Sequence, residues 1–147
     1  MLHAKIIDVS SEKIDILKAE KFLSSSNFGA IIYFVGTVRN LNENKKVIGI
    51  TYDSRDTMVT KSFEEIYKES EDKLKIKDKA VFIEHVKGYA AIKEKSIIIG
   101  VACKHRDEAY NLSRFIIEEI KKRTPIWKKE HYANEKSEWL KGASIQL

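Results

Sequence analysis

The chain has 147 residues, of which 43 % are hydrophobic and 33 % are charged, and its formal net charge is +5. This composition excludes a disordered protein, and the length suits one domain over residues 1–147. No apolar run approaches the ~18 residues of a membrane span, and the N-terminus lacks the apolar core of a signal peptide, so we expect a cytoplasmic protein without membrane contact. The single cysteine, Cys103, excludes an internal disulfide. The positive charge favours an anionic partner but does not choose among nucleic acid, a phosphorylated metabolite and an acidic protein.

The first third of the chain predicts strands around one short helix. Residues 4–8 predict a strand and residues 14–23 a short helix. Residues 29–38 are rich in β-branched and aromatic residues between two glycines, which is typical of a buried strand. Residues 39–46 have the Asn-rich polar content of an exposed turn, and residues 47–53 predict the next strand.

The rest of the chain alternates between helical and extended patterns. From Thr57 a helical period places one apolar stripe on a face, formed by Val59, Phe63, Ile66, Tyr67, Ser70 and Leu74. Residues 79–86 and 95–103 predict two strands joined through Gly88. A second helix carries the stripe Ala109, Leu112, Ile116 and Ile120, and Pro125 ends it because proline lacks an N–H. The pattern predicts an α+β fold with mixed or antiparallel strands and two main helices.

Two basic side chains stand where a strand passes into the second helix. His105 and Arg106 would join the unpaired N–H groups of the helix start, which is a common anion site. A surface turn that happens to be basic explains the same two residues equally well. Cys103 and His105 are too few to form a metal site, and we expect no metal and no cofactor.

A second basic group surrounds the only proline of the chain, in the stretch "KKRTPIWKKE". Lys121 ends the helix, where a lysine also favours the helix dipole. After Pro125 the segment continues extended, so Lys128 should point with Glu130, while Lys129 points to the other side. Crowded lysines in a pocket lower one another's pKa, and the residues alone leave this possibility open beside the dipole explanation.

Arg39 follows a buried strand directly, so its guanidinium should lie at the rim of the sheet, where it can grip a phosphate or remain solvated. His85 alternates with strand residues and is expected to be a packed or capping histidine. His3 and His131 carry no interpretable pattern. The sequence contains no Walker A loop, dinucleotide fingerprint, nucleophile elbow or CxxC pair.

Four of these stretches occur in an order and spacing that resembles one known family. They are "GAIIYFVGTVRN", "EHVKGY", "IIIGVACKHRDEAY" and "IKKRTPIWKKE". The chain resembles the large, catalytic subunit of molybdopterin synthase from about Gly29 to Trp139. The resemblance favours the pocket interpretation of the lysines over the dipole explanation.

The resemblance implies an α/β hammerhead fold and a sulfurtransferase of molybdenum cofactor biosynthesis. Such an enzyme converts cyclic pyranopterin monophosphate into molybdopterin by installing two sulfurs. The sulfur comes from a thiocarboxylate on the C-terminal glycine of a small ubiquitin-like subunit. Two large subunits form a central homodimer with one small subunit on each, giving a heterotetramer.

The same resemblance assigns residues. Lys121 and Lys128 correspond to the catalytic lysines, Lys121 for acid–base work and Lys128 for charge stabilisation and substrate orientation. It also implies a set of substrate-binding residues: Thr37, Val38, Arg39, His105, Arg106, Lys129 and Glu130. Of these, His105 and Arg106 can serve the pocket of the neighbouring large subunit.

Three features depart from the family pattern. Arg55 stands where an aromatic residue is usual, "AAIKEKS" lacks a glycine often found before that strand, and the sequence ends soon after Trp139, which puts a basic contribution from a longer tail in doubt. Two alternatives remain. A nucleic-acid-binding domain is disfavoured because the aromatics are not interleaved with the basic residues on one strand. A non-catalytic scaffold for a ubiquitin-like partner is disfavoured by the presence of Lys121 and Lys128.

Overall fold

The fold is taken from a computed structural model, which describes residues 1–133 and the backbone of residues 138–139. The expectation about the segment after Trp139 lies outside these residues. The described part contains three helices and eight strands, and these have the following bounds: β1 Leu2–Asp8, α1 Ile16–Leu23, β2 Ala30–Thr37, β3 Leu41–Asn42, β4 Lys45–Ser54, α2 Asp56–Leu74, β5 Lys79–Ala91, β6 Lys95–Cys103, α3 Arg106–Arg123, β7 Ile126–Tyr132 and β8 Glu138–Trp139. No helix in this part of the chain is both long and apolar enough to cross a membrane.

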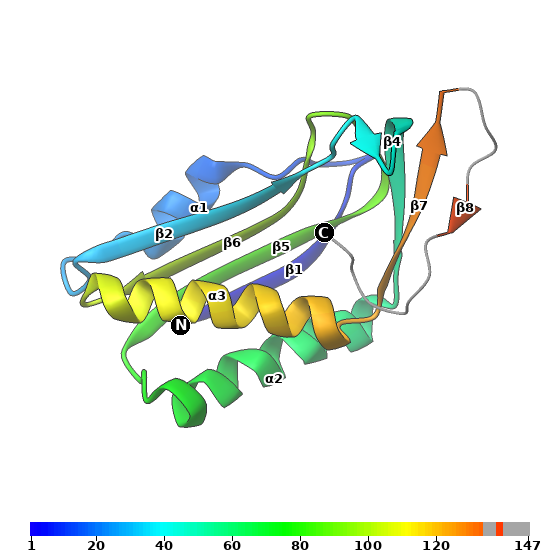
Figure 1. Cartoon of the computed structure of the whole chain (residues 1–147). Coiled ribbons are helices and arrows are strands. Elements are labelled where there is room, and N and C mark those ends of the chain that lie inside the picture. The colour runs from blue at the N-terminus through cyan, green and yellow to red at the C-terminus, as the bar shows by residue number, and fades with distance from the viewer. Residues whose placement is uncertain (134–137, 140–147) are drawn as a thin grey trace.

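The strands form one sheet in the order β2-β6-β5-β4-β7-β8, with β1 beside β5 and β3 beside β4. The β1–β5 pair is parallel, and the other pairs are antiparallel. Helices α2 and α3 lie side by side across one face of the β2-β6-β5-β1 part, and α1 lies behind it (Figure 1). The predicted α+β class with mixed strands is therefore confirmed.

The core lies around β6, where Ile97, Ile98 and Ile99 are all completely buried. Consecutive strand residues point to opposite faces, so burial of all three requires cover on both sides. On the α1 side, a Cβ added at Gly100 would stand 2.6 Å from Cδ1 of Leu23 in α1. This close approach explains why a glycine occupies the centre of a buried strand.

Strand β5 changes neighbours at Gly88. Up to Lys87 it pairs with β1, and from Gly88 onward it pairs with β4. The backbone of Gly88 has φ of +101°, which side-chain-bearing residues rarely adopt. The prediction that Gly88 joins two strands is therefore wrong. The strand bends there and continues to Ala91, and the connection to β6 follows over residues 92–94.

The bend at Gly88 carries the second part of the sheet, β4-β7-β8, away from the helices (Figure 1). A hairpin precedes it, because β3 pairs with the start of β4 through the two-residue turn Glu43–Asn44. Both turn residues have positive φ, as a type I′ turn requires. The exposed turn predicted over residues 39–46 is thus partly wrong, since residues 41–42 pair with residues 45–46 as strands and one residue of β3 is half-buried.

Candidate functional site

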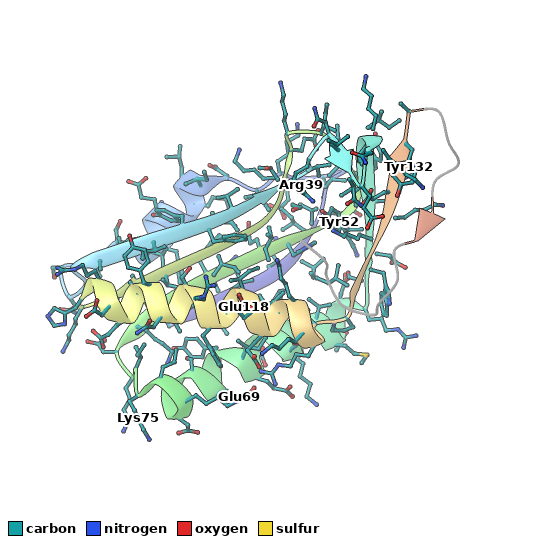
Figure 2. All side chains as sticks on the ribbon, in the orientation of Figure 1. Arg39, Tyr52, Glu69, Lys75, Glu118 and Tyr132 are labelled. Carbon is teal, nitrogen blue, oxygen red and sulfur yellow. The ribbon has the colours of Figure 1, made fainter. Side chains whose placement is uncertain are left out.

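A small pocket lies where the two parts of the sheet meet. Its volume is about 40 Å³. Figure 2 shows Arg39, Tyr52 and Tyr132 at this end of the molecule, close to β4. The lining comes from β2 and the residues after it, from the β3–β4 hairpin and from β7: Thr37, Arg39, Leu41, Asn42, Val47, Ile50, Tyr52, Lys128 and Glu130.

The local structure explains how the polar groups reach the pocket. The pairing of β2 with β6 shifts between Gly36 and Thr37, so the strand leaves its regular course just before Arg39. In β7 the burial alternates, with Ile126, Glu130 and Tyr132 buried. Lys128 belongs to the same face, as the period of two predicts. The pocket therefore receives one arginine and one lysine from segments that are distant in sequence.

Lys128 is the pocket's basic group with a shifted pKa. Burial lowers its pKa to about 8; the carboxylate of Glu130 opposes this, and the positive charges of Arg39 and Lys121 lower the pKa further. Lys121 lies in the last turn of α3, which leads directly into β7. The structure thus brings Lys121 and Arg39 close enough to Lys128 for their charges to act on its pKa. An amine with a pKa near 8 can exchange a proton close to neutral pH.

Glu130 is the one acidic side chain among the described residues that line the pocket. It is only 3 % exposed, and its Oε1 accepts a hydrogen bond of 2.8 Å from Nδ2 of Asn42. Its Oε2 is buried without a hydrogen-bond partner in the part of the chain that the structure describes. A carboxylate oxygen in this state can accept a further hydrogen bond.

A buried polar group supports the wall behind the pocket. The imidazole of His85 on β5 packs edge-on against Tyr52, with ring centroids 5.0 Å apart. His85 donates from Nδ1 to the Val86 carbonyl at 2.7 Å, which leaves Nε2 unprotonated in the neutral ring. Burial lowers the pKa of His85 to about 4, and the charge of Lys128 adds to this. The expectation of a packed histidine is confirmed.

Several residues assigned by the resemblance lie outside the pocket. Val38 is buried in the core, and its backbone is hydrogen-bonded to Lys93 and Glu94. Lys129 lies opposite Thr51 on the other face of β7. His105 and Arg106 are exposed at the start of α3. Lys121 is 15 residues further along this helix, so the two ends lie roughly 22 Å apart at 1.5 Å per residue.

The sequence analysis missed Asn42, Tyr52 and the apolar lining. Asn42 lies in a stretch whose composition predicts an exposed turn. A two-residue type I′ turn joins two paired strands, so a hairpin was the alternative interpretation of this stretch. Tyr52 lies in a predicted strand, but only the tertiary pairing of β4 with β7 turns it toward Lys128. Within the described residues no group of three or more His, Cys, Asp or Glu is arranged to hold a metal ion. The fold and the site define an α+β protein with a small pocket that is lined by an arginine, a lysine and a buried glutamate.

Comparison with known proteins gives the family. Residues 9–123 match the family described as "MoaE protein". The molybdopterin synthase catalytic subunit of Synechococcus elongatus is 36 % identical over 136 residues, which cover 92 % of this chain and 82 % of that relative. The chain belongs to the MoaE family.

Two solved structures agree with this assignment. Molybdopterin synthase from Staphylococcus aureus superposes with a TM-score of 0.86 at 28 % identity, over 95 % of this chain and 97 % of that one. A protein–protein complex of subunits 1 and 2 of the molybdopterin-converting factor from Helicobacter pylori gives a TM-score of 0.75, also at 28 % identity, over 99 % and 94 %. The resemblance stated from the sequence motifs is therefore confirmed.

Proposed function

We propose that this chain is the catalytic subunit of a molybdopterin synthase. It transfers sulfur from the C-terminal thiocarboxylate of a small ubiquitin-like subunit to cyclic pyranopterin monophosphate, and the product is molybdopterin. Residues 1–147 act as one catalytic domain in the cytoplasm. The observation that carries the proposal is the cationic pocket of a MoaE-family chain: Arg39 and Lys128 line it, and Lys121 lies near enough for its charge to lower the pKa of Lys128.

The charges of the pocket suit both the substrate and the reaction. We assign the phosphate to Arg39, which lines the pocket, since a guanidinium can donate two parallel hydrogen bonds to it. Lys128 stabilises negative charge while it is protonated, which its pKa of about 8 allows at neutral pH. Lys121 is assigned the proton transfers that accompany the attack of sulfur.

One chain alone provides too little space for a pterin. The pocket of about 40 Å³ is far below the roughly 300 Å³ at which ordinary ligand pockets begin. His105 and Arg106 are also too far from Lys121 to complete the pocket of their own chain. A homodimer resolves both points, because a two-fold axis can bring the α3 start of one copy to the pocket of the other.

The second partner is a small sulfur-carrier subunit, and the complete assembly is a heterotetramer. The H. pylori structure is a complex of two different subunits, and this chain covers 94 % of the matched one. A flexible C-terminal tail that ends in a thiocarboxylate can enter a narrow pocket that a folded domain cannot. The cationic side chains at the pocket then meet the negative sulfur group.

The experiment is a conversion assay with the purified chain, cyclic pyranopterin monophosphate and a thiocarboxylated small subunit. We expect dithiolene product, detected after oxidation as a fluorescent pterin derivative. A small subunit with an ordinary C-terminal carboxylate should give none, and the Lys121→Ala chain should give none with the thiocarboxylated subunit. Absence of product with the wild-type chain and a competent thiocarboxylate would refute the proposed function.

A further inference from the structure

The β3–β4 hairpin touches the pocket through one polar contact. Asn42, half-buried on the two-residue strand β3, donates from Nδ2 to Oε1 of Glu130 at 2.8 Å. The two residues are 88 positions apart in the chain, so this contact ties the hairpin to β7. Both side chains line the pocket. The contact therefore fixes two side chains of the pocket as well as the position of the hairpin.

The hydrogen bond distinguishes the two carboxylate oxygens of Glu130. Oε1 is engaged by the Asn42 amide, and Oε2 is buried without a partner among the described residues. Leaving a buried carboxylate oxygen unpaired is costly unless a ligand completes it. The other polar side chains that the structure describes in the lining carry positive charge or a neutral hydroxyl or amide, so Oε2 is the one anionic acceptor in the described lining that has no partner.

We propose that Asn42 is a positioning residue, which holds the Glu130 carboxylate so that Oε2 accepts a hydrogen bond from an N–H group of the substrate. The inference rests on the proposed function, in which the substrate is a pterin. Cyclic pyranopterin monophosphate carries N–H donors on its pterin ring and a phosphate at its other end, and the pocket offers an anionic acceptor and a cationic rim to match. Asn42 acts through Glu130 and does not take part in the chemistry.

The same contact affects Lys128. The Glu130 carboxylate is the group that keeps the pKa of Lys128 from falling as far as burial and the neighbouring cations would take it. A carboxylate released from Asn42 can turn away from Lys128. The pKa of Lys128 should then fall below its present value, and the fraction of charged Lys128 at neutral pH should fall with it.

The test is a double-mutant cycle with two readouts. Asn42→Leu removes the donor at nearly constant size, and Glu130→Met removes the acceptor. Binding of cyclic pyranopterin monophosphate is measured by calorimetry, and the titration of Lys128 is followed by NMR of its labelled Nζ group, assigned with Lys128→Met. Asn44→Gly is the matched control, because it alters the same hairpin at an exposed turn residue with φ of +66° that glycine accepts.

We expect Asn42→Leu to weaken pterin binding about tenfold, the size of one charge-assisted hydrogen bond, and to lower the pKa of Lys128. In the Glu130→Met background Asn42→Leu should change neither the pterin affinity nor the pKa of Lys128. Asn44→Gly in the wild-type background should also leave both quantities unchanged. Equal losses of affinity in both backgrounds, or an unchanged Lys128 titration, would overturn the positioning role. Failure of the wild-type chain to bind the pterin would instead count against the proposed function, and the Lys128 titration would still decide the role of Asn42.

Discussion

Replacing Lys128 by methionine should stabilise the fold while it abolishes conversion. Burial and nearby cations lower the pKa of Lys128 from 10.5 to about 8, so the folded protein binds this proton less tightly than the unfolded chain does. Each pKa unit corresponds to about 1.4 kcal/mol, which gives about 3.4 kcal/mol as an upper bound. Because part of the side chain remains in contact with water, screening reduces this to about 2 kcal/mol. For a domain of this size the melting temperature should rise by about 4–8 °C.

The size of the stabilisation depends on pH in a way that identifies its cause. Below pH 8 Lys128 is charged in both the folded and the unfolded state, so the folded protein bears the full free-energy cost of burying the charge. Between pH 8 and 10.5 only the unfolded chain holds the proton, so the wild type gains stability as the pH rises. The advantage of Lys128→Met should therefore be largest at pH 6.5 and nearly gone at pH 10.5.

The assay is urea unfolding of both proteins at pH 6.5 and 10.5. Lys122→Met serves as the charge-matched control, since Lys122 is exposed on α3 and its ion pair with Glu119 at 3.4 Å contributes little. A destabilised Lys128→Met protein, or a gain of equal size at both pH values, would refute the reasoning.

Three further changes have defined outcomes. Lys121→Ala should abolish conversion with the chain still folded, because alanine is well tolerated at a helix end. It should also raise the pKa of Lys128 above about 8 by removing a neighbouring positive charge. Circular dichroism checks the fold and NMR titration the pKa, and conversion near the wild-type rate would remove Lys121 from the mechanism. Gly88→Ala should lower the free energy of unfolding by about 1–3 kcal/mol, because φ is +101° and the new Cβ would stand 2.7 Å from Cγ2 of Val9; an unchanged unfolding curve would contradict this. Cys103 is completely buried and its pKa is raised to about 11, so iodoacetamide at pH 8 should label the thiol only in denaturant, as mass spectrometry would show; rapid labelling of the native chain would be the contrary result.

The sequence predicted the elements better than their ends. The helical stripe from Val59 to Leu74 and the strand over residues 95–103 follow from period and composition, and both are found. Gly88 misled the prediction because a glycine between two extended runs indicates a turn as readily as a bend in one strand. Only the pairing with β1 before it and β4 after it shows that β5 continues.

The site was predictable where it depends on local order and hidden where it depends on distant contacts. The two-residue period of an extended segment is enough to place Lys128 and Glu130 on one face of β7. Asn42 could not be found in this way, because its contact with Glu130 spans 88 positions. The lowered pKa of Lys128 likewise comes first from burial and then from the charges of Arg39, beyond the end of β2, and Lys121 in α3, and no local pattern brings these together.

The central claim is that two copies of this chain build one sulfur-transfer pocket, and mixing two inactive variants tests it most directly. Lys121→Ala disables the pocket of its own copy, and Arg106→Ala removes the proposed contribution to the pocket of the other copy. After the two proteins are unfolded together and refolded at equal amounts, about half of the dimers should be mixed, and each has one of two pockets intact. Conversion should therefore return to about one quarter of the wild-type rate. If Arg106→Ala alone is inactive and the mixture converts no faster than the sum of the two variants, the shared pocket is contradicted.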